Sequence, residues 1–427
     1  VYEYCYSAIK KIMPGHLIEK HDARSGEDLV TCWHDFMEKP HAMEGVAPIV
    51  LALETRQDYV DAAAYLLDEL IWIRSGFGRE EREAYLTCDR PGRGIPLPRY
   101  RGEDGHEAGP DSFGGLPLDA RPRVLRLLED YEEYMATGGL LDDDGVSLEA
   151  YSVRSRIHEH RELQARCVLV DELQDCSTVE LAVIAEIPTS CENGLFLTGD
   201  PVQKVFAKQH ELVKAGIDIV GRGAILRQNY RNSRQILEAA FRIIEKFKDL
   251  AAVPKSEILE PEFAFRDGAT PSVYECSGRE EQQRLIIWFL ANTLDASSYD
   301  LTCIAGPSDE SLRDMEAACA DWGIPTFRIT GDTSRKGEIG GGVKLALLQD
   351  IKGFEFGQVF LIDLIDSYLL PKGMPFEERW RAAFQLYVAM TRARDDLIMS
   401  YIYNRSILLG PLADTVQECV AAELLST

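Results

Sequence analysis

The stretch VLVDELQD at residues 168–175, followed by LFLTGDPVQKVF at residues 195–206, decides the fold of this chain. The first piece begins with the apolar run VLV and the second with LFL, and both runs stop abruptly near acidic residues. Buried parallel strands of α/β proteins end in this way. Because ligands of open α/β sheets lie beyond the carboxyl ends of the strands, the pattern predicts a ligand site at Asp171, Glu172 and Asp200.

The residue types at these strand ends suit a nucleotide with its magnesium ion. Phosphoryl transfer to water needs a carboxylate that holds Mg²⁺, usually through water, and a second group that orients or deprotonates the attacking water. Asp171 fits the first role and Glu172 the second. Gln203 follows the neighbouring strand, where its amide would sense the γ-phosphate. An isolated Asp-Glu pair is more often a solvated strand end, and only the paired pattern favours the nucleotide.

Three further segments follow in order: LRQNYRNSRQIL at 226–237, KGFEFGQVFLIDL at 352–364 and LYVAMTRARDDLIM at 386–399. Together with DELQD and GDPVQKVF, they resemble motifs II to VI of the UvrD/Rep/PcrA-like family of superfamily 1 DNA helicases and translocases. The ordered set is far more specific than any one motif. The resemblance implies an α/β chain with two RecA-like parallel-sheet domains, a helical insertion in the first, and ATP-driven movement on single-stranded DNA or RNA.

The resemblance also assigns roles to residues of the later motifs. Tyr230 would stack on the adenine, and Arg231 and Arg392 would reach the γ-phosphate. Arginine suits this task because a planar, permanently charged guanidinium can grip two oxygens of a transferring phosphoryl group. Gly353 would let the backbone approach phosphate, and Glu355 would bond the ribose hydroxyls. The expected catalytic residues are Glu172, Gln203, Arg231 and Arg392; the expected nucleotide-binding residues are Asp200, Tyr230, Gly353 and Glu355; and the expected Mg²⁺ ligand is Asp171.

One part of the expected site is missing from the sequence. No G-x-x-x-x-G-K-[ST] phosphate loop occurs, and the nearest segment, GEIGGGVK at 337–344, has its lysine one position late and Leu345 after it. In the resembled family this loop lies near the N-terminus, so an upstream segment or a protein partner would supply it. The alternative is a nonhydrolysing relative that serves as a nucleic-acid-binding or scaffold subunit of a larger nuclease or defence assembly. Residues 1–427 alone are expected to be inactive in ATP hydrolysis.

The order of the motifs suggests four segments. Residues 1–57 would belong to the first RecA-like domain, residues 58–159 to the helical insertion with a long Gly/Pro/charged loop, and residues 160–225 to the rest of the first domain. Residues 226–427 would form the second RecA-like domain. Between motifs IV and V the sequence predicts only strands at 272–274, 301–305 and 326–329 and helices at 280–294 and 312–322, so a large accessory insertion is expected to be absent.

The end of the chain is predicted to continue this pattern. A helix that begins near Phe376 would carry motif VI as far as Arg394, a strand would follow at 397–401, and residues 407–425 would form an amphipathic helix. Motif V departs from the family because Leu347 and Gln349 stand where a threonine and a histidine are usual. Contacts of motif V to the DNA strand are therefore expected to be weaker.

Composition narrows the class of protein. A formal net charge of −25 would repel a phosphate backbone, so DNA contacts would have to come from a local basic strip with stacking. The ten cysteines include no C-x-x-C pair, which argues against a zinc site. No run approaches the roughly 20 apolar residues that a bilayer requires. These features are typical of a cytoplasmic enzyme.

Overall fold

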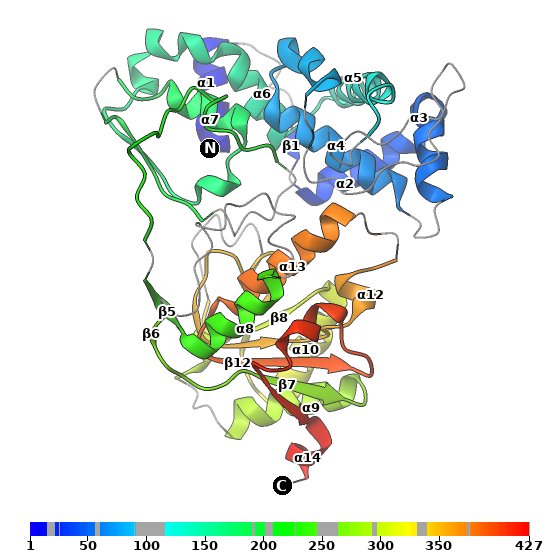
Figure 1. Cartoon of the computed structure of the whole chain (residues 1–427), viewed down its shortest axis with the longest axis vertical. Helices are drawn as coiled ribbons and strands as arrows, with labels where there is room; N and C mark the ends of the chain where they lie inside the picture. Colours follow the sequence, from blue (N-terminus) through cyan, green and yellow to red (C-terminus); the bar gives the residue numbers. More distant parts are fainter. Residues whose placement is uncertain are drawn as a thin grey trace. The chain divides into compact units, whose positions relative to one another are not determined.

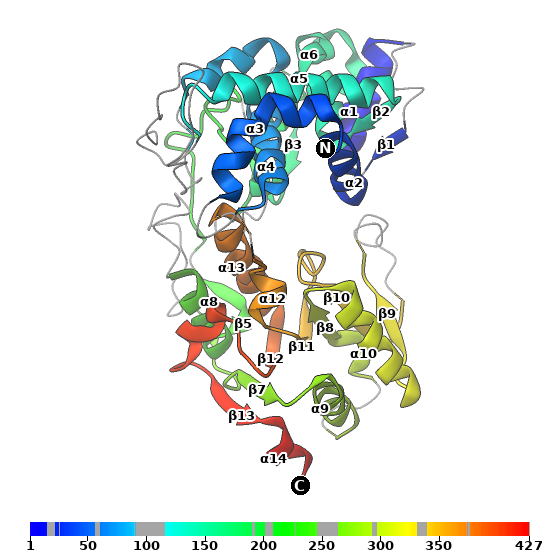
Figure 2. The same cartoon turned by 90° about the vertical axis from the view of Figure 1, so that its right-hand side faces the viewer.

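The computed structural model describes residues 1–14, 22–24, 26–55, 60–88, 90, 116–189, 193–200, 208–226, 228–245, 264–292, 297–330, 340–372, 374 and 376–426. The chain divides into two compact units. The first is Val1–Ala224 with Gly373–Glu377, and the second is Ile225–Lys372 with Glu378–Thr427. Figures 1 and 2 show the elements of both units from two sides.

The first unit is mainly helical. Its helices are α1 (Tyr2–Ile12), α2 (Gly26–Met37), α3 (Pro40–Glu54), α4 (Ala62–Gly76), α5 (Arg121–Thr137), α6 (Asp143–Val153) and α7 (Thr178–Ala185). Two pairs of short parallel strands join them: β1 (Asp22–Arg24) with β2 (Leu140–Asp142), and β3 (Val168–Val170) with β4 (Leu195–Leu197). Several helix starts have clear local causes. Asp61 caps α4 through a 2.9 Å bond from the backbone N–H of Ala64, and Ser177 and Glu180 form a capping box on α7.

Helices α2 to α5 share one apolar core. Trp33 and Phe36 of α2, Tyr65 of α4 and Tyr131 of α5 are fully or almost fully buried within it. The ring of Trp33 meets that of Tyr131 edge-on at 5.4 Å between centroids, a favourable aromatic geometry. Helices α2 and α3 precede residue 58, the expected start of the helical insertion, and they pack in the same core as α4 and α5.

The strands β3 and β4 carry the predicted magnesium site at their carboxyl ends. They pair in parallel, with Leu169 opposite Phe196. Among the described residues each of these strands pairs only with the other. Leu169 is 73% exposed and Phe196 is 58% exposed, although parallel sheets normally bury both faces.

The second unit is built on a seven-stranded parallel sheet in the order β13-β7-β12-β11-β8-β10-β9. Its strands are β7 (Ser272–Cys276), β8 (Thr302–Gly306), β9 (Thr326–Arg328), β10 (Val343–Leu347), β11 (Phe356–Leu361), β12 (Ala393–Ile402) and β13 (Gln417–Val420). This sheet confirms the predicted α/β class. The strands expected at 272–274, 301–305 and 326–329 are β7, β8 and β9.

Helices cover both faces of this sheet. Every residue of β8 is buried, which requires cover on each side because successive side chains point to opposite faces. Helices α9 (Arg279–Asn292) and α10 (Asp309–Asp321) share one core with Ile304, Val343 and Phe360 of the sheet. The unit also contains α8 (Arg234–Glu245), α12 (Asp366–Leu369), α13 (Phe376–Met390), α14 (Ala421–Leu425) and a separate parallel pair, β5 (Asn229–Ser233) with β6 (Ala264–Arg266) (Figure 1).

Two predictions about the end of the chain are wrong. Helix α13 ends at Met390, so Arg392 lies on the turn after it and Arg394 lies in β12. Residues 407–425 do not form one helix, because Gly410 and Pro411 confine the first part to a short 3₁₀ helix at Ile407–Leu412. The next part becomes β13, which pairs with β7 at the edge of the sheet, and only Ala421–Leu425 is α-helical.

In the part of the chain that the structure describes, every helix falls short of the length and apolar content needed to cross a membrane.

Candidate nucleotide site

Asp171 lies at the carboxyl end of β3, where its carboxylate receives two hydrogen bonds. Thr198, at the end of β4, donates from Oγ1 to Oδ1 of Asp171 at 2.6 Å, and the backbone N–H of Glu172 donates to the same oxygen at 3.0 Å. Both bonds lower the pKa of Asp171 below its ordinary value, and the bond from the Thr198 hydroxyl has the larger effect. Asp171 is therefore an exposed carboxylate that stays ionised, as a Mg²⁺ ligand must be.

Glu172 adopts a left-handed backbone conformation, with φ of 52°, directly after Asp171. Residues with side chains seldom adopt this conformation, and those that do are concentrated at functional sites. The side chain of Glu172 accepts a short hydrogen bond from Nε2 of Gln174. The unusual backbone thus turns the chain sharply at the point where the sequence predicts a catalytic carboxylate.

Gln174 joins the two predicted acidic positions of this unit. Its amide is buried, its Nε2 donates to Glu172, and its Oε1 accepts from the backbone N–H of Asp200 at 2.9 Å. The structure therefore brings Asp171, Glu172 and Asp200 together. Sequence reasoning missed Gln174 and Thr198 as members of the site, although both lie inside the quoted stretches and carry groups that can bond a neighbouring strand end.

Gly199 allows the two turns to touch. A Cβ at Gly199 would lie 2.8 Å from both Cβ of Leu173 and Oε1 of Gln174, and 3.1 Å from the backbone nitrogen of Leu173. The same nitrogen donates to the carbonyl oxygen of Thr198 at 2.9 Å. The GDPVQ segment thus requires glycine at position 199, because the turn at Leu173 and Gln174 comes too close to leave room for a side chain.

Gln203 lies outside the described residues. The chain is described again from Lys208, whose Nζ lies 3.4 Å from Oδ1 of Asp144 and 3.6 Å from Oε2 of Glu180. Burial alone would lower the pKa of Lys208, but the charges of Asp144 and Glu180 outweigh it and the pKa is raised. The next residue, Gln209, bonds to the ends of two helices. Its backbone N–H donates to Oγ of Ser75 at 2.8 Å, and its carbonyl oxygen accepts from the backbone N–H of Thr178 at 2.9 Å.

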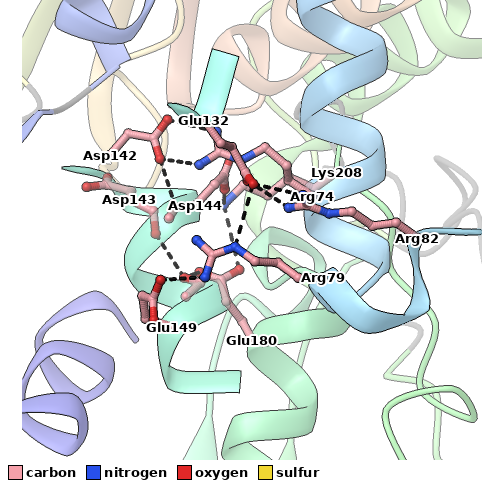
Figure 3. A network of polar contacts seen from close by, with 12 residues as sticks. Arg74, Arg79, Arg82, Glu132, Asp142, Asp143, Asp144, Glu149, Glu180 and Lys208 are labelled. Atoms are coloured by element: carbon pink, nitrogen blue, oxygen red, sulfur yellow. Dashed lines mark hydrogen bonds and ion pairs between the residues drawn. The ribbon is translucent and has the colours of Figure 1, made fainter. Parts of the chain in front are cut away.

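Lys208 belongs to a larger network of charged side chains, shown in Figure 3. Within it, Arg74 of α4 donates from Nη1 to Oδ2 of Asp142 at 2.8 Å, and Arg82 bonds both oxygens of Glu132 on α5 at 2.8 and 2.7 Å. Burial would raise the pKa of Asp142, but the charge of Arg74 outweighs it and lowers the pKa. The network connects α4, α5, α6 and α7 by ionic contacts that are largely removed from water.

The second unit brings two other predicted residues together. Arg231 on β5 is ion-paired through Nη2 with Oε1 of Glu355, and the two side chains are 39% and 44% exposed. Glu355 comes two residues after Gly353, which has φ of 85° and no atom within 4 Å of the position that a Cβ would occupy. Its left-handed backbone, rather than crowding, is therefore what requires glycine at position 353.

Tyr230 is 66% exposed and contacts a second aromatic residue. The centroid of its ring lies 5.3 Å from that of Phe265 on β6, which is also 66% exposed, and its hydroxyl donates to Oε1 of Gln228 at 2.8 Å. An exposed ring is available for stacking on a planar base. Sequence reasoning missed Phe265, because an aromatic residue next to Arg266 gives no sign in the sequence that it lies beside Tyr230.

Arg392 is buried, with 2% of the residue exposed. Its Nε donates to the carbonyl oxygen of Val388 at 3.1 Å, at the end of α13. The backbone carbonyl of Arg392 accepts from the N–H of Phe356 at 3.0 Å, which joins motif VI to the residue after Glu355.

Lys344 cannot serve as a phosphate-loop lysine. It is buried at the start of β10, where Nζ donates to the carbonyl oxygen of Gly342 at 2.5 Å and lies 3.5 Å from Oδ1 of Asp300. This placement agrees with the mismatch in sequence spacing and assigns the lysine a structural role.

Comparison with protein families gives a match to the UvrD/REP helicase N-terminal domain over residues 118–210. Residues 118–210 are therefore similar to the N-terminal domain of UvrD/REP helicases. The matched residues include both strand ends of the candidate site, with Asp171, Glu172 and Asp200, and also Lys208 and its acidic partners. The resemblance seen in DELQD and GDPVQKVF is thereby confirmed.

Among solved structures, the chain is similar to the C-terminal domain of a possible DNA helicase from Lactobacillus plantarum WCFS1. The two share 19% sequence identity with a TM-score of 0.34, and the likeness covers 44% of this chain and 98% of the other. No curated protein matches the sequence. The likeness to UvrD/REP helicases therefore rests on the match over residues 118–210.

Proposed function

We propose that this protein is an ATP-dependent DNA helicase or single-stranded-DNA translocase. The observation that carries the proposal is the turn at Asp171 and Glu172, which lies within the residues that match the UvrD/REP helicase domain. An ionised carboxylate directly followed by a second one on a sharp turn is the arrangement that metal-assisted phosphoryl transfer to water requires.

The described residues fit ATP and Mg²⁺ in their chemistry. Asp171 would hold Mg²⁺, which needs only one or two protein carboxylates because water and phosphate oxygens fill its other positions. In the described part of the chain, no group of three or more His, Cys, Asp or Glu side chains is placed to hold a metal ion. Bound Mg²⁺ would neutralise charge on the phosphates, and Glu172 would orient and deprotonate the attacking water.

The second unit offers groups for the rest of the nucleotide. Tyr230 presents an exposed ring for the adenine, Glu355 a carboxylate for the ribose hydroxyls, and Arg231 a guanidinium for the γ-phosphate. We assign Arg392 as a second γ-phosphate ligand and Gln203 as the sensor of that phosphate. Gly353 and Asp200 would border the nucleotide through their backbone turns.

The phosphate loop would be supplied from outside residues 1–427, by an upstream segment or by a partner protein. The exposed pair of Leu169 and Phe196 supports this proposal, because a parallel sheet with a bare apolar face is stabilised by further strands and covering helices. A strand added in parallel would also place its carboxyl end, and any loop that follows, beside Asp171.

Single-stranded DNA is the proposed track. The formal net charge of −25 means that binding must rely on stacking and on local arginines rather than on the overall field. A second function is favoured by one observation, the absence of a phosphate-loop lysine in the sequence together with the structural role of Lys344. On that view the chain is a noncatalytic subunit of a nuclease or defence assembly that binds nucleic acid.

One experiment separates the two functions. ATP hydrolysis by the full-length protein is measured with and without single-stranded DNA, beside Glu172→Gln. The helicase proposal expects DNA-stimulated hydrolysis that falls at least about 100-fold in the variant. Equal rates in the two proteins would remove Glu172 from the mechanism, and a complete lack of hydrolysis would favour the noncatalytic subunit.

A further inference from the structure

Asn232 is a buried side chain whose amide bonds two backbone carbonyls of a distant segment. It is 1% exposed, and its Nδ2 donates to the carbonyl oxygens of Thr391 at 2.8 Å and of Ala393 at 2.7 Å. Its Oδ1 accepts from Nδ2 of Asn229 at 3.1 Å. Carbonyl oxygens can only accept, so the amide nitrogen must face Thr391 and Ala393, and both of its hydrogens are used.

These bonds link the two backbone segments that carry the predicted phosphate-binding arginines. Thr391 and Ala393 are the residues on either side of Arg392, and Asn232 directly follows Arg231. The start of this short segment is fixed as well, because Oδ1 of Asn229 accepts the backbone N–H groups of Arg231 at 2.8 Å and of Asn232 at 3.0 Å. One buried amide thus joins the backbone that carries Arg231 to the backbone that carries Arg392.

A second side chain, at the surface, also links these two backbone segments. Arg266 donates through Nη2 to the carbonyl oxygen of Arg231 at 3.1 Å and to that of Arg394, and through Nη1 to Oδ1 of Asp395 at 2.8 Å. Because Arg266 is one-third exposed, water competes for these bonds. The bonds of Asn232 are shielded from water, so we expect them to set the distance between the backbone segments that carry Arg231 and Arg392.

We propose that Asn232 is a positioning residue that fixes Arg231 and Arg392 in one arrangement for recognition of the γ-phosphate; this rests on the nucleotide site proposed above. The chemistry of the amide is specific. A serine has one donor and can bond only one of the two carbonyls, and an ionised aspartate has none and would repel both. Small displacements of groups that grip a phosphoryl oxygen carry large costs, so loss of either bond should weaken recognition of that phosphate.

The test is the preference of the full-length protein for a γ-phosphate. Dissociation constants for Mg²⁺-ADP and for a slowly hydrolysed Mg²⁺-ATP analogue are measured for the unaltered protein, Asn232→Ser and Asn232→Asp, and their ratio is compared. The ratio is independent of the fraction of folded protein, so a variant that only destabilises the fold leaves it unchanged. We expect the preference for the triphosphate to fall about tenfold in Asn232→Ser and further in Asn232→Asp.

Gln282 provides the matched control. It is another buried amide of the same unit, bonded to Oγ of Ser400 at 3.0 Å on β12. Gln282→Ala should lower thermal stability and leave the ratio of the two constants unchanged. An unchanged ratio in both Asn232 variants, with measurable binding, would overturn the positioning role alone. Failure of the unaltered protein to bind either nucleotide would overturn the proposed nucleotide site and the positioning role with it.

Discussion

Arg231 and Glu355, which come from motifs separated by more than a hundred positions in the sequence, are ion-paired in the second unit. Each side chain is about two-fifths exposed, so the pair contributes only about 0–1 kcal/mol to stability. On the proposed nucleotide site, the two groups would serve binding rather than folding. In the absence of a nucleotide each group neutralises the other, and a bound nucleotide would exchange this contact for its ribose and its phosphates.

Glu355→Gln should therefore change ribose recognition with little effect on folding. We expect the preference of the full-length protein for ATP over 2′-deoxy-ATP to fall about tenfold, because a charged acceptor for the hydroxyl is lost. Competition binding with the two nucleotides measures this, and Glu310→Gln, which alters an exposed partner of Arg279, is the control. Unchanged discrimination in Glu355→Gln would remove Glu355 from the ribose site.

Thr198→Val should shift the pH dependence of ATP hydrolysis. The Thr198 hydroxyl is the main cause of the lowered pKa of Asp171, so its removal raises that pKa. The acidic limb of the rate profile should move to higher pH, and the Mg²⁺ concentration for half-maximal rate should rise several-fold. Thr55→Val, which removes a hydroxyl bonded to the carbonyl of Leu51 in the same unit, should leave both unchanged. Coincident profiles for Thr198→Val and the unaltered protein would contradict the role of this bond.

Lys208→Met should destabilise the first unit by about 2–4 kcal/mol, because it leaves Asp144 and Glu180 without their cation in a site that is largely closed to water. Chemical unfolding followed by far-ultraviolet circular dichroism measures the change. Lys11→Met, which breaks the exposed pair with Glu162, is the matched control and should cost less than about 1 kcal/mol. Similar costs for the two variants would show that burial of the charged network does not increase its contribution to stability.

Acid should weaken the first unit in a defined pH window. Burial would raise the pKa values of Asp142, Glu132 and Glu180, but their arginine and lysine partners outweigh it and all three are lowered. Groups with depressed pKa values add stability above their unfolded values and lose it as the pH falls through the folded ones. The free energy of unfolding should therefore be level above about pH 6 and fall below about pH 4, by about 1.4 kcal/mol per pH unit for each proton taken up.

The acid response is checked by urea unfolding between pH 7 and pH 3. Asp142→Asn should be less stable at neutral pH, because Arg74 keeps Glu132 but loses its ionised partner at position 142, and should show a shallower fall in acid by one proton. A slope equal to that of the unaltered protein would mean that Asp142 takes up no extra proton on unfolding.

Gly199→Ala should disturb the candidate site directly. The added methyl would lie 2.8 Å from Leu173 and Gln174, so the two turns must separate, at a cost of about 1–3 kcal/mol. DNA-stimulated hydrolysis should fall more than stability alone explains. Gly223→Ala, where a Cβ would meet nothing within 4 Å, should change neither property. Full activity in Gly199→Ala would show that the contact between the turns is dispensable.

Much of the fold could be predicted from local patterns. The alternation of apolar runs with helical periods located β7, β8, β9, α9 and α10, because each depends on its own residues. The end of the chain could not be predicted in this way. The apolar spacing of residues 407–425 is helical, but Gln417–Val420 is a strand because β7 offers it an open edge, which is a property of the folded sheet.

The candidate site divides in the same manner. Asp171, Glu172, Arg231 and Glu355 could be named as candidates from the sequence because their motifs are contiguous. Gln174, Thr198 and Asn232 were missed because their importance comes from bonds across long sequence distances, such as the 159 positions between Asn232 and Thr391. Amides and hydroxyls at turn positions carry no periodic signal, and only the folded chain shows which carbonyls and carboxylates they meet.

The place of β7 in the sheet has a consequence for synthesis on the ribosome. Its neighbours are β12 and β13, both of which are made later than the other strands of that sheet. At about 5–20 residues per second, β7 waits roughly 5–25 s before either neighbour exists. Its apolar residues are exposed during that interval, so the yield of folded protein should depend on chaperones that hold nascent chains and on the speed of translation.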